Sequence, residues 1–133
     1  IINNLIDDFI SQNKNAFAFK SMGQLKYISL LKYTSVVIGN SSSGVIETPY
    51  FKVPTVNIGD REEGRIKTKN IIDCKPLEKQ ITISIQKALS DKFKDSLKEM
   101  ENPLYQNNTS KKILKILKTL PNDKSTKKDF FDI

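Results

Sequence analysis

A short apolar strand followed by a serine-rich turn constrains the fold of this chain more than any other feature. Residues 36–38 are Val-Val-Ile, the pattern of a strand that is buried on both faces of a parallel sheet. Residues 39–44, the serine turn, are small and polar, and Val45 then begins a new apolar run. The sequence therefore predicts a strand, a tight turn and a helix start, the place where open α/β sheets bind their ligands.

The serine turn is a candidate anion site. Ser41, Ser42 and Ser43 lie where a helix start presents free backbone N–H groups and the positive end of its dipole. Gly39 and Gly44 allow the backbone to bend and a ligand to come close. A structural interpretation fits equally well, because one serine can cap the helix while the others fill the turn. On these residues alone both interpretations stay open.

The rest of the chain alternates between helical and strand patterns. Apolar residues at helical spacing predict helices over residues 2–11, 25–31, 47–51, 78–89, 92–100 and 111–120. Alternating or β-branched runs predict strands over residues 16–19, 36–38, 55–58 and 71–74. This alternation indicates an α/β fold, a Rossmann-like parallel sheet with helices on both faces.

Composition narrows the class of protein. A chain of 133 residues, 38% of them hydrophobic, has enough apolar residues to form one domain with an ordinary hydrophobic core. No apolar run is long enough to cross a bilayer, and the first residues do not resemble a signal peptide. The single cysteine, Cys74, excludes an internal disulfide and favours the reducing cytoplasm. Because the sequence has no histidine and one cysteine, we expect no metal site of the common transition-metal kinds and no histidine base. We expect no cofactor either.

The formal net charge of +7 raises the question of a nucleic-acid partner. Four of the basic residues lie on one short segment, Lys111, Lys112, Lys115 and Lys118. The same segment has apolar residues at helical spacing, as an amphipathic helix does. It has no aromatic residues among its lysines, whereas a surface that binds single-stranded nucleic acid would have them. A solvated helix face is therefore favoured, and a basic nucleic-acid-binding module is the outside alternative.

Three segments carry a resemblance to a known family. Residues 39–47 are Gly-Asn-Ser-Ser-Ser-Gly-Val-Ile-Glu, residues 53–61 are Val-Pro-Thr-Val-Asn-Ile-Gly-Asp-Arg, and residues 70–74 are Asn-Ile-Ile-Asp-Cys. With Gly64-Arg65 between them, they resemble the hydrolysing UDP-N-acetylglucosamine 2-epimerases. That family makes N-acetylmannosamine for sialic-acid synthesis, and close relatives act on diacetamido sugars for legionaminic acid.

The resemblance implies an incomplete two-lobed enzyme. The family has two Rossmann-like halves of the glycosyltransferase-B type, with the nucleotide in the cleft between them. Residues 1–120 correspond to the carboxyl-terminal, UDP-binding lobe without its first strand. Residues 121–133, which include Phe130 and Phe131, correspond to a tail that crosses to an absent amino-terminal lobe. The implied partners are a UDP-sugar substrate and that missing lobe, while a homo-oligomer is an open alternative.

The resemblance also assigns roles to the serine turn and the residues after it. Ser41 and Ser42 match positions that hold the diphosphate, and Ser43 and Gly44 belong to the backbone of the same phosphate turn. Glu47 matches the carboxylate that accepts hydrogen bonds from the ribose hydroxyls. A simpler explanation of Glu47 is that the dipole at the start of the helix favours a carboxylate there.

Arg61 matches an arginine that contacts phosphate, and its guanidinium suits two phosphate oxygens. The alternative is a solvated loop in which Arg61 pairs with Asp60, Glu62 or Glu63. The family reaction is an anti-elimination of UDP followed by addition of water, and its acid and base groups lie largely outside this chain. Catalytic residues therefore stay unknown. A non-hydrolysing epimerase and a glycosyltransferase-B-type transferase are the alternative functions.

Overall fold

The structure is a computed structural model that describes residues 1–120. The chain divides into two units, Ile1–Asn102 and Pro103–Ile133, which are described separately. The first unit contains the sheet and the serine turn, so it contains every candidate site residue.

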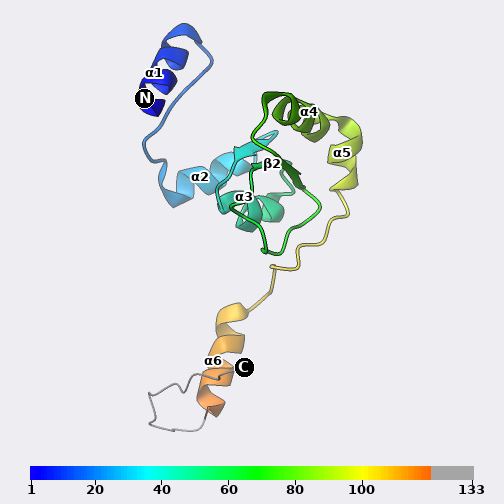
Figure 1. The fold of residues 1–133 in the computed structure, drawn as a ribbon. Coiled ribbons are helices and arrows are strands. Elements are labelled where there is room, and N and C mark those ends of the chain that lie inside the picture. Colours follow the sequence, from blue (N-terminus) through cyan, green and yellow to red (C-terminus); the bar gives the residue numbers. More distant parts are fainter. Residues whose placement is uncertain (121–133) are drawn as a thin grey trace, which may run out of the picture. The chain divides into compact units, whose positions relative to one another are not determined.

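Three parallel strands form the centre of the first unit (Figure 1). β1 (Val37–Gly39) pairs with β2 (Thr55–Ile58), and β2 pairs with β3 (Ile71–Cys74), in the order β1-β2-β3. Because all three run the same way, their carboxyl ends lie at one edge of the sheet. The α/β class with a parallel, Rossmann-like sheet is confirmed.

Helices account for most of the remaining residues of this unit. They are α1 (Ile2–Gln12), α2 (Gly23–Leu31), α3 (Ser43–Ile46), the 3₁₀ turn η1 (Thr48–Phe51), α4 (Glu78–Leu89) and α5 (Asp91–Ser96). Each was predicted within a few residues, except that α5 ends earlier than the expected residue 100. After Ser96 the backbone continues in turns with i→i+3 hydrogen bonds, such as the one from Met100 N–H to Leu97 O. Leu97 and Met100 are buried in this segment.

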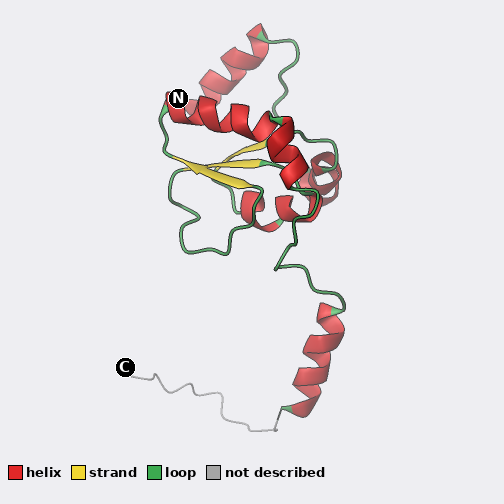
Figure 2. Cartoon of the chain, turned by 90° about the vertical axis from the view of Figure 1, so that its right-hand side faces the viewer, coloured by secondary structure: helices red, strands yellow, loops and turns green. Residues whose placement is uncertain are grey.

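Alternation along β2 separates the two faces of the sheet. Val56 is fully buried with Ile72 and Ala88 on the face covered by α4. Thr55, one residue earlier, points to the opposite face and contacts α3. Figure 2 shows helices above and below the three strands, as the sequence predicted.

Two expectations about strands are wrong. Residues 16–19 form no strand, because an alternating segment needs a neighbouring strand and this one has none among the described residues; Phe17 and Phe19 are largely exposed. The strand before the serine turn is also not buried on both faces. Ile38 is 47% exposed, because β1 is an edge strand that pairs with β2 alone in the described sheet.

The described part of the second unit contains one helix, α6 (Thr109–Thr119). Its apolar residues, Ile113, Leu114, Ile116 and Leu117, are about half exposed within the structure, with the four lysines on the same helix. The predicted tail of residues 121–133, with Phe130 and Phe131, lies outside the described residues. Across residues 1–120 no helix has both the length and the apolar character needed to cross a membrane.

Candidate functional site

The serine turn connects β1 to α3 and is closed by its own hydrogen bonds. The N–H of Ser43 donates to Ser41 Oγ at 3.3 Å, and the N–H of Gly44 donates to the Ser41 carbonyl oxygen at 3.0 Å. Val45 N–H donates to Ser42 O at 3.0 Å. Ser41 Oγ therefore helps to close the turn, in line with the structural interpretation of the serines, while Ser42, the N-cap residue of α3, makes no side-chain capping hydrogen bond.

The hydrogen bonds that close the turn leave other polar groups of the turn available. The N–H groups of Ser41 and Ser42 and the Ser42 hydroxyl make no hydrogen bond to any described residue. The Ser43 hydroxyl shares a hydrogen bond with the Tyr27 hydroxyl of α2, so it is already engaged in a contact within the fold. The donors free to meet an anion are thus at positions 41 and 42, rather than at Ser43 and Gly44.

Gly44 is explained by packing. A Cβ atom at this position would lie 2.8 Å from Thr55 Cγ2, closer than real side chains approach. Thr55 cannot easily move away, because it is buried and its hydroxyl lies 2.8 Å from that of Thr48. Glycine therefore lets α3 lie directly on β2, which fixes where the serine turn begins.

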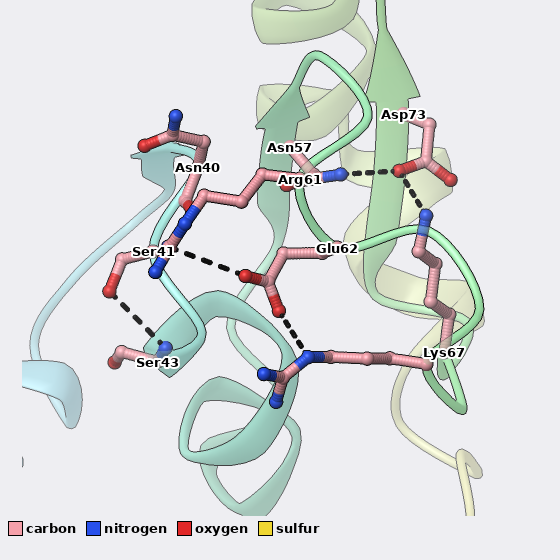
Figure 3. A network of polar contacts seen from close by, with 9 residues as sticks. Asn40, Ser41, Ser43, Asn57, Arg61, Glu62, Lys67 and Asp73 are labelled. Carbon is pink, nitrogen blue, oxygen red and sulfur yellow. Dashed lines mark hydrogen bonds and ion pairs between the residues drawn. The ribbon is translucent and has the colours of Figure 1, made fainter.

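Arg61 follows β2 and reaches the serine turn from the neighbouring loop. Its Nη1 donates a 2.7 Å hydrogen bond to the carbonyl oxygen of Asn40, the residue before Ser41 (Figure 3). The same Nη1 lies 3.4 Å from Glu62 Oε1, and 61% of the arginine side chain is exposed. The structure thus brings Arg61 and the serine turn together, and it also contains the Arg61–Glu62 pair expected for a purely structural loop.

Sequence reasoning missed the buried carboxylate beneath Arg61. The Glu62 side chain is only 1% exposed, and Arg65 Nε lies 2.9 Å from its Oε2 in an ion pair. The i,i+3 spacing of Glu62 and Arg65 was the available signal. This spacing does not by itself predict a buried pair, because a run of charged residues usually forms a solvated surface.

Glu47 lies one turn beyond the serines, between α3 and η1. Its N–H donates to Ser43 O at 2.9 Å, which holds its backbone against the turn. Its carboxylate oxygen Oε2 is shielded from solvent and has no hydrogen-bond partner among the described residues. Because an unpartnered buried acceptor is costly, a ligand hydroxyl that donates to this carboxylate would remove that cost.

A second polar cluster lies at the carboxyl ends of β2 and β3. Asp73 Oδ1 accepts hydrogen bonds from Lys67 Nζ and Asn57 Nδ2, both at 2.7 Å (Figure 3). Burial raises the pKa of the Asp73 carboxyl, but the hydrogen bonds from Lys67 and Asn57 and the charge of Lys67 outweigh burial, so its pKa is lowered. The adjacent pocket of about 660 Å³ is lined by Gly59, Asp60, Glu63, Lys67, Asp73, Cys74, Lys75, Pro76 and Gln80.

We expect the Asp73 cluster to make the free energy of unfolding depend on pH in the acidic range. A carboxyl whose pKa is lowered by folding stabilises the fold above its unfolded value of 3.8, and that contribution disappears as the pH falls through the folded value. Urea unfolding near pH 7 should show Asp73→Asn about 0.5–1 kcal/mol less stable than wild type, the range for a half-exposed pair, and this difference should shrink progressively as the pH falls below 3.8. Asp7→Asn, which removes an unpaired exposed carboxylate, is the control. A difference that does not decrease as the pH is lowered would contradict the assignment.

A family model described as UDP-N-acetylglucosamine 2-epimerase matches residues 2–118, which include the serine turn, Glu47 and the Arg61 loop. The chain belongs to this family. The match extends through both described units and confirms the resemblance seen in the sequence.

Curated relatives agree with the family model. The chain is 38% identical over its whole length to GDP/UDP-N,N'-diacetylbacillosamine 2-epimerase (hydrolyzing) of Campylobacter jejuni, and covers 35% of that protein. It is 38% identical over 80% of its length to the polysialic acid biosynthesis protein P7 of Escherichia coli, covering 28% of it. It is 30% identical over 91% of its length to UDP-N,N'-diacetylbacillosamine 2-epimerase (hydrolyzing) of Legionella pneumophila, covering 31%. The chain spans about a third of the length of these relatives.

Proposed function

We propose that this chain holds the UDP part of a nucleotide sugar for a hydrolysing 2-epimerase. In this proposal Ser41 and Ser42 bind the diphosphate through their free N–H groups and the Ser42 hydroxyl. Ser43 and Gly44 complete the backbone of the phosphate turn. The reaction of the whole enzyme releases UDP and N-acetylmannosamine or a related acetamido sugar. The Campylobacter and Legionella relatives are both named as hydrolysing 2-epimerases, which supports the hydrolysing outcome.

The contact between Arg61 and Asn40 is the observation that carries the proposal. It brings a guanidinium from 21 residues away onto the turn that carries the free serine donors. Arg61 Nε and Nη2 have no partner among the described residues, so they remain available to phosphate oxygens. The unpartnered Glu47 carboxylate, one helical turn further on, is the acceptor that the ribose hydroxyls require.

Titration calorimetry with UDP and with uridine tests the proposal. Arg61→Ala should weaken UDP binding by about 1–3 kcal/mol and leave uridine binding unchanged, because its partner is the diphosphate. Glu47→Ala should weaken both ligands by a similar amount, because its partner is the ribose. Glu63→Ala, which removes an exposed glutamate whose side chain has no partner among the described residues, is the control. If both site variants bind UDP as well as wild type does, the assignment of these residues is wrong.

A further inference from the structure

The buried glutamate of the Arg61 loop has no role in the site as proposed so far. Glu62 is 1% exposed, although burying a carboxylate is unfavourable and the charge needs partners. Its partners are Arg61 and Arg65, and these are the only two arginines in the sequence, among many lysines. Both arginines of the chain therefore converge on one buried carboxylate, beside the serine turn.

The pairing leaves the outer faces of both guanidinium groups free. Arg61 uses Nη1 for Glu62 and Asn40, and Arg65 uses Nε for Glu62. The other two nitrogens of each guanidinium have no partner among the described residues, and the side chains are 61% and 49% exposed. Arginine suits this arrangement, because a planar guanidinium held along one edge still presents donors along another.

We infer that Glu62 is a positioning residue that holds Arg61 and Arg65 as a two-arginine clamp for the diphosphate of the nucleotide. This inference rests on the proposed function. Two long side chains that were free in solvent would lose rotamer entropy on binding phosphate, and the buried carboxylate removes part of that loss in advance. Arg65 thereby becomes a second diphosphate-binding residue, and Asn40 fixes the clamp to the serine turn through its carbonyl oxygen.

Charge and positioning make opposite predictions for Glu62→Gln. The substitution removes a negative charge near the phosphates, which by itself would tighten UDP binding. It also removes the anchor of both guanidinium groups, which should weaken UDP binding. If positioning dominates, titration calorimetry should show UDP affinity about tenfold weaker, the size of one charge-assisted hydrogen bond, and uridine affinity unchanged.

Matched variants separate these effects. Glu63→Gln removes the same charge from the same loop but touches neither arginine, so UDP affinity should stay equal or rise. In an Arg61→Ala/Arg65→Ala background, adding Glu62→Gln should cause no further loss, because there is nothing left to position. Circular dichroism on each variant checks that the fold is retained. If Glu62→Gln does not fold, Arg65→Gln is the second variant, since its side chain is half exposed, and it should also lose UDP affinity and keep uridine affinity.

The outcomes distinguish failure of the two-arginine clamp from failure of the proposed UDP-binding function. If wild type binds neither UDP nor uridine, the proposed function fails and the clamp fails with it. If wild type binds UDP and Arg61→Ala weakens it, but a folded Glu62→Gln binds UDP as tightly as wild type or more tightly, the site stands and the positioning role is overturned. The positioning role would also be overturned if Glu62→Gln lowers UDP affinity as much in the Arg61→Ala/Arg65→Ala background as it does in wild type.

Discussion

Replacing Asn70 by alanine should lower the free energy of unfolding by about 3 kcal/mol, because the change leaves several buried polar groups without partners. Asn70 is fully buried between β2 and β3. Its Nδ2 donates to Val53 O at 2.7 Å and to Thr48 Oγ1 at 3.0 Å, and its Oδ1 accepts from the Thr68 hydroxyl. Urea unfolding followed by circular dichroism measures the loss.

The matched control is Asn4→Ala, which removes the same side chain from an exposed position of α1. That variant should stay within about 0.5 kcal/mol of wild type. A loss of less than about 1 kcal/mol for Asn70→Ala would mean that water replaces the missing amide, and the buried network would then not be a determinant of stability.

The Asn70 network also connects stability to the candidate site. Thr48 Oγ1, which accepts from Asn70, donates to the Gly44 carbonyl oxygen at 2.8 Å. Gly44 is the residue at which α3 lies against β2, directly after the three serines. Loss of Asn70 should therefore loosen the serine turn as well as the sheet.

The sequence predicted the parts of the fold that depend on local pattern. Strand β2 and strand β3 were expected at residues 55–58 and 71–74, and they lie at those positions. The turn after β1 was predicted from its glycines and serines, and the family resemblance was carried by the same residues. These features are local because turn residues and β-branched runs restrict the backbone wherever they occur.

Features that depend on distant neighbours were predicted poorly. The alternating residues 16–19 have a strand pattern but no strand beside them in the described part of the chain. Glu62 looks like one of several solvated charges, and only the three-dimensional structure reveals that it is buried under both arginines. The contact of Arg61 with Asn40 was likewise invisible, because spacing along the chain does not specify which loop a long side chain crosses.

The largest effect that we expect concerns catalysis by the isolated chain. Mixed with UDP-N-acetylglucosamine, the 133-residue chain should release UDP only at the background rate, about six orders of magnitude or more below an ordinary enzyme. The chain has no histidine, and it spans about a third of the length of its curated relatives. A protein that carries this chain within a length like theirs should release UDP together with a free acetamido sugar. A non-hydrolysing epimerase would instead return the sugar still attached to UDP, so analysis of the products separates the two.

UDP release by the isolated chain above background would contradict this expectation and would place an acid and a base among Asp60, Glu62, Glu63 and Asp73. The structure argues against two of these. Glu62 is buried and both of its carboxylate oxygens lie in ion pairs with arginines, so a sugar has no access to it. Although burial opposes ionisation of Asp73, hydrogen bonds from Lys67 and Asn57 lower its pKa, which favours the charged form at neutral pH and makes it a poor general acid. Release that disappears in Asp60→Asn or Glu63→Gln would then identify the group responsible.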